Sequence, residues 1–228
     1  MSRLPTRAEK PRFVAAMFGR IARRYDLMNT LITVGQDARW RRAVAELVPA
    51  DARCVLDVGA GTGKLAGAIA QRRPGALVTG ADFALPMLLA GSPPRATAAD
   101  ALALPYPSDT FDAVVSAFVV RNLADVRAGL QEQVRVLRPG GRLIVLEITP
   151  GPGGLLGHLF RLYFRRLVPI LGGLIAGDAA AYAYLPESAA VFLAPERLAD
   201  LLGSLGMLDV SIRRFGLGSV GLLAARRP

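Results

Sequence analysis

Residues 53–64 read RCVLDVGAGTGK, a short apolar run that leads into three closely spaced glycines. The apolar residues up to Asp57 predict a short buried strand, and Lys64 to about Arg72 reads as a helix. The glycines between them form a turn that lets backbone N–H groups approach a nucleotide closely. The stretch therefore predicts a nucleotide-binding strand–turn–helix unit.

Two common glycine motifs do not fit this turn. A phosphate-binding loop, G-x-x-x-x-G-K-[ST], needs glycine where Val58 stands and Ser or Thr where Leu65 stands. The dinucleotide motif G-x-G-x-x-G needs glycine at the position of Lys64. What remains is D-x-G-x-G-x-G, with the acidic Asp82 at the end of the next expected strand.

Strands and helices alternate outward from this unit. Such alternation predicts an α/β fold with a doubly wound, Rossmann-like sheet of about seven mostly parallel strands. The expected strands are 53–57, 76–82, 96–100, 111–118, 143–148, 208–213 and 220–225, and the expected helices 13–24, 37–48, 64–72, 85–90, 124–137 and 196–205.

The length of 228 residues predicts a single domain. Its expected parts are an N-terminal helical cap (1–50), a nucleotide-binding core (51–150), a helical insertion (151–194) and a C-terminal helix with a strand pair (195–228). The insertion is apolar, but arginines interrupt it, so we expect no membrane span. His158, Arg161 and Arg165 fall near one helical face, which leaves open a lid, an interfacial helix or ordinary core packing.

The composition of the chain limits the kinds of site and partner that it can have. Cys54 is the only cysteine and His158 the only histidine, which argues against a disulfide framework, a zinc site and histidine catalysis; we expect no metal. The net charge is +10, which suits nucleic acid, an anionic membrane or a merely arginine-rich composition. The opening MSRLPTRAEKPR lacks the apolar stretch of a secretory signal, so we expect a cytoplasmic protein.

The glycine pattern resembles that of class I S-adenosylmethionine-dependent methyltransferases. The resemblance implies that the acidic residue after the second strand binds the ribose hydroxyls and that the residues after the third strand contact adenine. A purely structural turn and helix capping by Asp82 are the alternatives. The implied cofactor-binding residues are Asp57, Gly59, Gly61, Thr62, Gly63, Asp82, Phe83, Asp100, Ala101 and Ala117.

Four longer blocks resemble the ubiquinone/menaquinone biosynthesis C-methyltransferases. They are FGRIARRYDLMNTLITVGQDARWRR (18–42), LPYPSDTFDAVVSAFVVRNLAD (104–125), RVLRPGGRLIVLEITP (135–150) and GLIAGDAAAYAYLPESAAVF (173–192). The likeness extends from about Phe13 to Arg227. The chain departs from the family where Ala117 aligns with a serine, and where Asp37-Ala38-Arg39 stands in place of the His-Arg that precedes the N-terminal tryptophan.

This resemblance implies methyl transfer from S-adenosylmethionine to a ring carbon of a prenylated quinol. Tyr25, Arg121 and Asn122 are the implied catalytic residues, while Asp26 and Asn29 would fix the cap over the site. For Arg121, a helical ion pair with Asp125 is the structural alternative. Another amphipathic acceptor, such as a phospholipid amine or prenylated phenol, and cofactor binding without turnover both stay open.

The resemblance also implies partners. A prenylated substrate implies transient contact with the inner face of the plasma membrane. The motifs of two nucleic-acid methyltransferase classes are missing: there is no D/N/S-P-P-Y/F motif after the fourth strand, and Cys54 lies inside the first strand. We therefore expect no nucleic-acid partner, and leave a homo-oligomer open.

Overall fold

The computed structural model describes residues 4–93, 95–151, 154, 157 and 162–228. His158 and Arg161, which the sequence places on one face with Arg165, lie outside these residues. Within the described residues, no helix is long and apolar enough to cross a membrane.

A single sheet organises the described residues, with strand order β3-β2-β1-β4-β5-β7-β6. Neighbouring strands from β3 to β5 pair in parallel, whereas β7 pairs antiparallel with both β5 and β6. The strands are β1 (Cys54–Val58), β2 (Leu77–Asp82), β3 (Ala96–Ala98), β4 (Phe111–Ala117), β5 (Leu137–Ile148), β6 (Leu208–Phe215) and β7 (Val220–Arg226). This mostly parallel sheet of seven strands confirms the predicted fold class.

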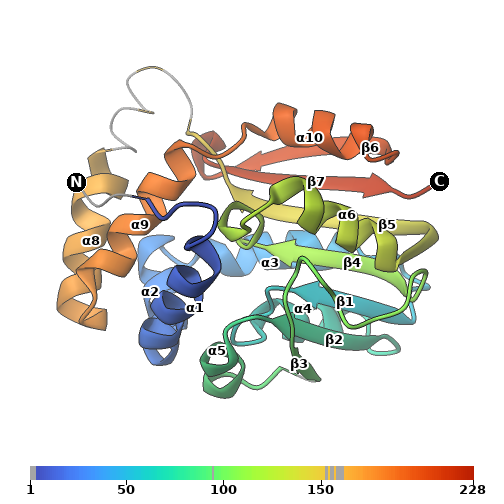
Figure 1. The fold of residues 1–228 in the computed structure, drawn as a ribbon, viewed down its shortest axis with the longest axis horizontal. Coiled ribbons are helices and arrows are strands. Elements are labelled where there is room, and N and C mark those ends of the chain that lie inside the picture. The colour runs from blue at the N-terminus through green and yellow to red at the C-terminus, as the bar shows by residue number, and fades with distance from the viewer. Residues whose placement is uncertain (1–3, 94, 152–153, 155–156, 158–161) are drawn as a thin grey trace.

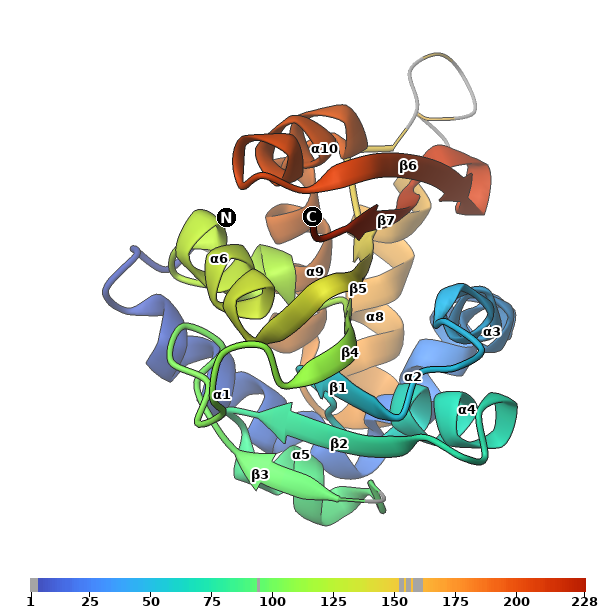
Figure 2. The same cartoon turned by 90° about the vertical axis from the view of Figure 1, so that its right-hand side faces the viewer.

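Helices cover both faces of this sheet (Figures 1 and 2). The core on one face includes α6 (Val126–Val136) and α10 (Pro195–Ser204), and the core on the other includes α3 (Gln36–Leu47) and α4 (Lys64–Arg72). Strands β1, β4 and β5 contribute fully buried residues to both cores. Parallel strands covered on both faces explain their continuous apolar sequences.

The remaining helices gather at the carboxyl ends of the parallel strands (Figure 1). Most of them share a third core, in which Met17, Met28 and Tyr182 are buried, while η1 and α5 meet in a smaller cluster around Ala22 and Met87. They comprise α1 (Lys10–Ile21), η1 (Ala22–Arg24), α2 (Tyr25–Ile32), α5 (Leu85–Ala90), η3 (Tyr163–Leu167), α8 (Val168–Leu171), η4 (Gly172–Ala176) and α9 (Ala179–Ala190), with α5 packed against α1 and η1.

Two local predictions differ from the structure. Helix α2 was not expected; it has eight residues and no side-chain N-cap, so its sequence carries little helical signal. Strand β5 begins at Leu137 instead of residue 143, although the RPGGR sequence is typical of a turn. There Leu137 pairs with Phe111, and the Gly140 N–H donates to the Arg227 carbonyl at 3.0 Å, so pairing continues through the glycines.

Candidate active site

The glycine turn follows β1 at the point where the sheet order reverses between β1 and β4, which is where α/β sheets bind ligands. Gly59, Gly61 and Gly63 have φ values of +73°, +55° and +84°, which favour glycine. The N–H groups of Gly59 and Ala60 donate to the Ala81 carbonyl at 2.7 and 3.1 Å. The turn is thereby fixed against the end of β2.

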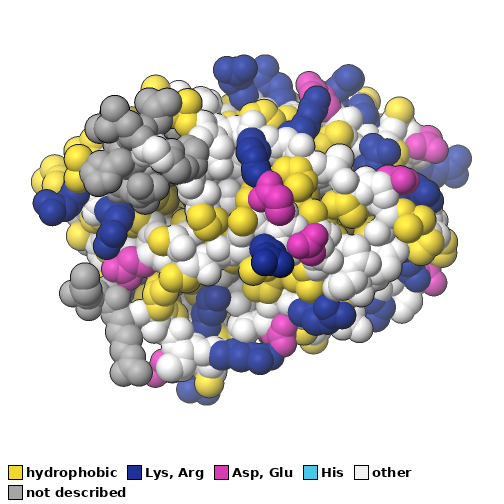
Figure 3. All heavy atoms as spheres, turned by 90° about the horizontal axis from the view of Figure 1, so that it is seen from above, with side chains coloured by type: hydrophobic (Ala, Val, Ile, Leu, Met, Phe, Trp, Pro, Cys, Tyr) yellow, Lys and Arg dark blue, Asp and Glu magenta, His cyan; other side chains and the backbone are white. Residues whose placement is uncertain are grey.

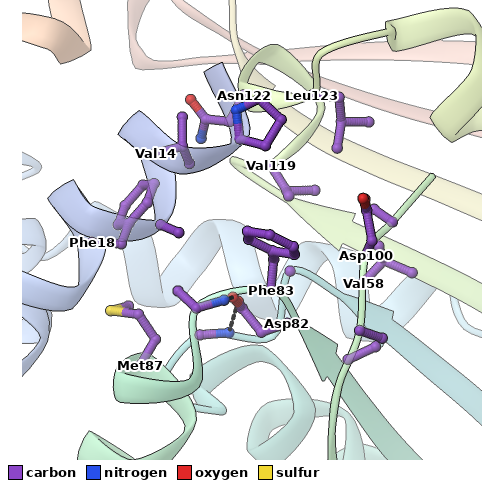
Figure 4. Close-up of a pocket in the computed structure, with 18 of the residues that line it drawn as sticks. Val14, Phe18, Val58, Asp82, Phe83, Met87, Asp100, Val119, Asn122 and Leu123 are labelled. Atoms are coloured by element: carbon purple, nitrogen blue, oxygen red, sulfur yellow. Dashed lines mark hydrogen bonds between the residues drawn. The ribbon is translucent and has the colours of Figure 1, made fainter. Parts of the chain in front are cut away.

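Asp82 completes the link between the two strand ends. One of its carboxylate oxygens accepts the Gly61 N–H and the other accepts the Ala84 N–H, both at 2.8 Å. Burial raises the pKa of this carboxyl. Helix capping, the structural alternative for Asp82, is not realised, because the N-cap residue of α5 is Ala84 and no side chain caps this helix. The Asp82 carboxylate instead faces a cavity (Figure 4).

That first cavity collects most of the predicted cofactor residues. Figure 4 shows Asp82 and Phe83 on one side and Val14 and Phe18 of α1 on the other. The predicted residues on its wall are Tyr25, Gly59, Gly61, Asp82, Phe83, Asp100, Ala101, Ala117 and Asn122. A carboxylate can accept hydrogen bonds from the two ribose hydroxyls of S-adenosylmethionine, and an apolar cleft can hold its flat adenine ring. The cavity therefore fits this cofactor.

Three predicted cofactor residues do not line this cavity. Gly63 packs against Pro93, where a Cβ would lie 2.7 Å from the Pro93 Cα atom. Thr62 donates its hydroxyl to Asp26 of α2 at 2.8 Å, which ties the N-terminal cap to the glycine turn. This contact supports the expectation that Asp26 fixes the cap.

Asp57 lies buried near the end of β1, and neither of its carboxylate oxygens makes a hydrogen bond of good geometry with the described residues, although the Ala66 N–H lies close enough to oppose the rise of its pKa. Burial, with a smaller effect of the nearby Asp82 charge, raises the pKa of Asp57 to about 8. The raised pKa favours the protonated carboxyl, and the role of Asp57 in cofactor binding stays a prediction.

A second cavity of about 290 Å³ shares Tyr25 and Phe118 with the first. Apolar side chains of distant segments form much of its wall, among them Trp40, Ile148, Phe164, Leu185 and Leu217. Polar side chains, including Asn29, Asp37, Arg41 and Arg121, line it as well. Such a mainly apolar space with a few polar groups suits a hydrophobic molecule that carries a polar end.

Phe118 stands between the two cavities in a strained conformation. Its φ is +61°, which is rare for a bulky residue and concentrates at functional sites. Its N–H donates to the Leu146 carbonyl, and its own carbonyl accepts from Arg121 at 2.7 Å and from the Asn122 side chain at 3.1 Å. The strained backbone thus anchors two predicted catalytic residues.

Arg121 forms a buried ion pair with Glu147 of β5. Its Nη1 atom lies 2.6 Å from a Glu147 carboxylate oxygen, and its backbone N–H donates to the other oxygen at 3.0 Å. The side chains are 2% and 0% exposed. The alternative pairing with Asp125 is wrong, because Asp125 instead caps α6 and contacts Arg7.

Asn122 and Tyr25 are placed by other partners. The Tyr184 hydroxyl of α9 lies 3.2 Å from the Asn122 side-chain oxygen and donates to it. Burial raises the pKa of the Tyr25 hydroxyl, while its hydrogen bond with Asn29 and the charges of Arg121 and Arg41 oppose this rise. Two arginines therefore act on the hydroxyl at the junction of the cavities.

The sequence analysis missed several residues of the second cavity and its supports. Glu147 had a signal, because it is the one charge in the apolar run LIVLEI of β5. Asp37 and Arg41 are one helical turn apart and form a partly buried ion pair at 2.5 Å, a spacing that can be read from the sequence. Tyr184 had no comparable signal.

Metal ligation has no support in the described part of the chain. No group of three or more His, Cys, Asp or Glu side chains is placed there to hold an ion. The expected absence of a metal stays a prediction.

The glycine turn, Asp82 and the sheet order define a class I S-adenosylmethionine-dependent methyltransferase. Solved structures share this fold: a methyltransferase from Thermotoga maritima, described as a possible histamine N-methyltransferase, has a TM-score of 0.68 at 17% identity, covering 93% of this chain and 99% of its own. One from Archaeoglobus fulgidus has a TM-score of 0.66 at 16% identity, covering 89% and 99%.

Residues 6–226 match the model of the ubiE/COQ5 methyltransferase family, and the chain belongs to this family. A demethylmenaquinone methyltransferase of Thermus thermophilus is 47% identical, covering 90% of this chain and 97% of its own length. The enzyme of the same name from Deinococcus radiodurans is 46% identical, covering 87% and 86%.

Proposed function

We propose that this methyltransferase converts demethylmenaquinol to menaquinol in respiratory quinone biosynthesis, by methylating a ring carbon of the prenylated quinol. A ubiquinone precursor is the related acceptor. The names of the relatives support this reaction, and so does one structural observation. The cavity that fits the methyl donor meets a mainly apolar second cavity at Tyr25 and Phe118.

S-adenosylmethionine, when bound, supplies an electrophilic methyl group. Asp82 and Asp100 would hold the ribose and the adenine, and Gly59 and Gly61 let the backbone approach the donor. The donor would then occupy a cavity whose wall also includes Tyr25 and Phe118. The contribution of this arrangement to the rate is orientation of the two reactants.

Attack by a ring carbon requires an electron-rich acceptor, so the substrate is the reduced quinol. Arg121 lines the second cavity and is oriented by Glu147, so its guanidinium can stabilise a ring hydroxyl as it becomes phenolate-like. Asn122, held by Tyr184, would orient a water molecule that takes part in proton removal. Tyr25 would position the ring between the two cavities.

We further propose that the enzyme works in the cytoplasm and visits the inner face of the plasma membrane. The acceptor's isoprenoid tail partitions into bilayers, and the net charge of +10 favours anionic lipid. Nucleic acid is not an expected partner, and self-association stays open.

The test incubates purified protein with S-adenosylmethionine and chemically reduced demethylmenaquinol in mild detergent. Mass spectrometry should find the quinone heavier by one CH₂, and Arg121→Ala should lose this product while keeping cofactor affinity. Transfer to a phospholipid amine or another prenylated phenol instead would favour the other acceptors. Cofactor binding without product on any of these acceptors would favour a homologue without turnover.

A further inference from the structure

We propose that α2 and the helical segment 163–176 form a docking face for an anionic lipid bilayer at the mouth of the second cavity. The inference rests on the proposed function in one respect, since a prenylated acceptor is what such a face would deliver. It specifies which surface meets the membrane and how the cavity is reached from it.

The two helical segments lie side by side in opposite directions. At one end, the Tyr163 hydroxyl donates to the Ile32 carbonyl at 2.9 Å. At the other end, the Arg24 guanidinium donates to the Ile175 carbonyl. The start of each segment thus contacts the end of the other. The two segments are therefore antiparallel neighbours, and their outer surfaces form one continuous face.

Large apolar side chains project from this face into solvent. Their exposure ranges from 44% at Leu31 to 82% at Val34. Leu27 and Leu31 lie one turn apart on α2, and Val34 follows in the turn after this helix. Leu167, Ile170 and Leu174 recur at helical spacing in the other segment, so each segment carries a stripe of apolar side chains. Single exposed apolar residues are ordinary, but stripes on two adjoining helices mark an interaction surface. The docking face comprises Leu27, Leu31 and Val34 with Leu167, Ile170 and Leu174.

Basic side chains flank the stripes. Arg23, Arg24, Arg165 and Arg166 are exposed, and the end of the molecule that α8 forms shows hydrophobic and basic side chains side by side (Figure 3). An apolar face with flanking arginines is the composition of a helix that lies in a lipid interface. Anionic head groups complement these charges, whereas a second copy of this strongly basic chain would repel them.

The acidic residues within or just after the two helical segments, Asp26 and Asp178, do not cancel this charge, because each already has a basic partner. Asp26 lies 3.9 Å from the Lys64 ammonium, and Asp178 lies 2.7 Å from the Arg20 guanidinium. Arg23, Arg165 and Arg166 therefore remain available to lipid phosphates, as do the N–H groups of Arg24 that do not donate to Ile175.

The docking face continues into the second cavity. Val34 belongs to the docking face and also lines the cavity. Tyr163, at the start of the second helical segment, lines the cavity as well. Leu217, which is 66% exposed, lines the cavity too. A quinol in the bilayer could thus insert its ring toward Arg121 while its tail remains in the lipid, so the enzyme need not extract the whole molecule.

Flotation on vesicles tests the surface. Wild-type protein should float with vesicles containing anionic lipid, and less so as salt is added. The double variant Ile170→Glu/Leu174→Glu should bind at least about tenfold more weakly. Leu208→Glu is the control, because Leu208 is 44% exposed at the opposite end of the sheet.

The charge is tested separately. Arg165→Gln/Arg166→Gln should weaken binding about fivefold per arginine, whereas Arg72→Gln/Arg213→Gln removes the same charge from exposed positions elsewhere and should weaken it much less. Equal losses from both pairs would overturn the assignment to this face, as would unchanged flotation of the Ile170/Leu174 variant.

An activity measurement separates this inference from the proposed function. With a short-tailed quinol in detergent, the Ile170→Glu/Leu174→Glu variant should turn over at the wild-type rate. With a long-tailed quinol embedded in anionic vesicles, it should lose most of its rate. If the wild type methylates neither quinol, the proposed function fails while flotation still reports on the face. A wild type that does not float but forms a dimer broken by these substitutions would overturn the lipid assignment.

Discussion

The Arg121 guanidinium and the Glu147 carboxylate lie 2.6 Å apart in a site where neither side chain is more than 2% exposed. Arg121 comes from the turn after β4 and Glu147 from β5, so the pair connects the residues at the junction of the cavities to the centre of the sheet. A buried charge pair is weak evidence for stability, because desolvation offsets most of the attraction. Its value here is that it orients Arg121.

We predict that Glu147→Gln lowers kcat by at least about tenfold while the affinity for S-adenosylmethionine stays the same. The reason is that Arg121 loses its oriented charge partner, and it lines the second cavity but not the first. The free energy of unfolding should fall by about 3 kcal/mol, since a buried guanidinium is left unneutralised. Steady-state kinetics, calorimetric titration and urea denaturation measure the three quantities.

Two further variants separate orientation from stability. Replacing the whole pair, Arg121→Met with Glu147→Leu, should recover much of the stability and none of the turnover. Glu46→Gln, at an exposed position, should change neither. Normal turnover in Glu147→Gln would contradict the positioning role.

A second prediction concerns the pH dependence of stability. The pKa of Asp57 is raised from 3.8 to about 8 by burial and by the Asp82 charge. Between these pH values the folded chain holds a proton that the unfolded chain has released, so its free energy of unfolding falls as the pH rises. The slope from this one group approaches about 1.4 kcal/mol per pH unit.

Asp57→Asn imitates the neutral carboxyl and should remove that slope. From pH 6.0 to pH 7.5, urea denaturation should show the variant gaining about 2 kcal/mol relative to the wild type. The exposed Asp51→Asn should keep the wild-type slope. If the stability curves of Asp57→Asn and the wild type run parallel, the carboxyl is already ionised in the folded chain.

The contact between Thr62 and Asp26 gives a third prediction. It joins the glycine turn to α2 at 2.8 Å, so it couples the cap to the cofactor site. A double-mutant cycle with Thr62→Val and Asp26→Asn should give a coupling of about 1 kcal/mol in the free energy of unfolding. Both single variants should bind S-adenosylmethionine several-fold more weakly.

Thr110→Val is the matched control for this cycle. The Thr110 hydroxyl donates to the Pro107 carbonyl in an exposed turn away from the cap. Its loss should leave cofactor affinity unchanged. Additive effects of Thr62→Val and Asp26→Asn would mean that the contact does not hold the cap.

The fold and the first cavity could be predicted because their signals are local in sequence. Strand, glycine turn and helix follow one another within residues 53–72, and Asp82 ends the next strand. Alternation of such units fixes the sheet class. In contrast, short α2 lacks a cap, and the start of β5 carries turn residues, so neither had a local signal.

The second cavity could not be predicted, because packing alone brings its walls together. Tyr25, Arg121, Tyr163 and Leu217 line it from four distant parts of the chain. The family resemblance gave Tyr25 and Arg121 their expected roles. Glu147 stands out in the sequence as the one charge in an apolar strand, but its partner Arg121 is identified only once β4 and β5 pair. Site residues that are brought together only by contacts between distant parts of the chain can be identified only from the structure.

The strained residue Phe118 gives the last prediction. At φ +61°, an L-residue is disfavoured by about 1–2 kcal/mol relative to glycine. The free energy of unfolding should therefore be higher for Phe118→Gly than for Phe118→Ala. In a strand the opposite order is expected, because glycine is disfavoured there. Both variants lose the ring that touches Trp40 and separates the cavities, so both should lose most of their turnover. Chemical denaturation ranks the two stabilities. An alanine variant more stable than the glycine variant would show that the backbone at this position relaxes, and the turn that holds Arg121 and Asn122 would then owe its shape to their side chains instead.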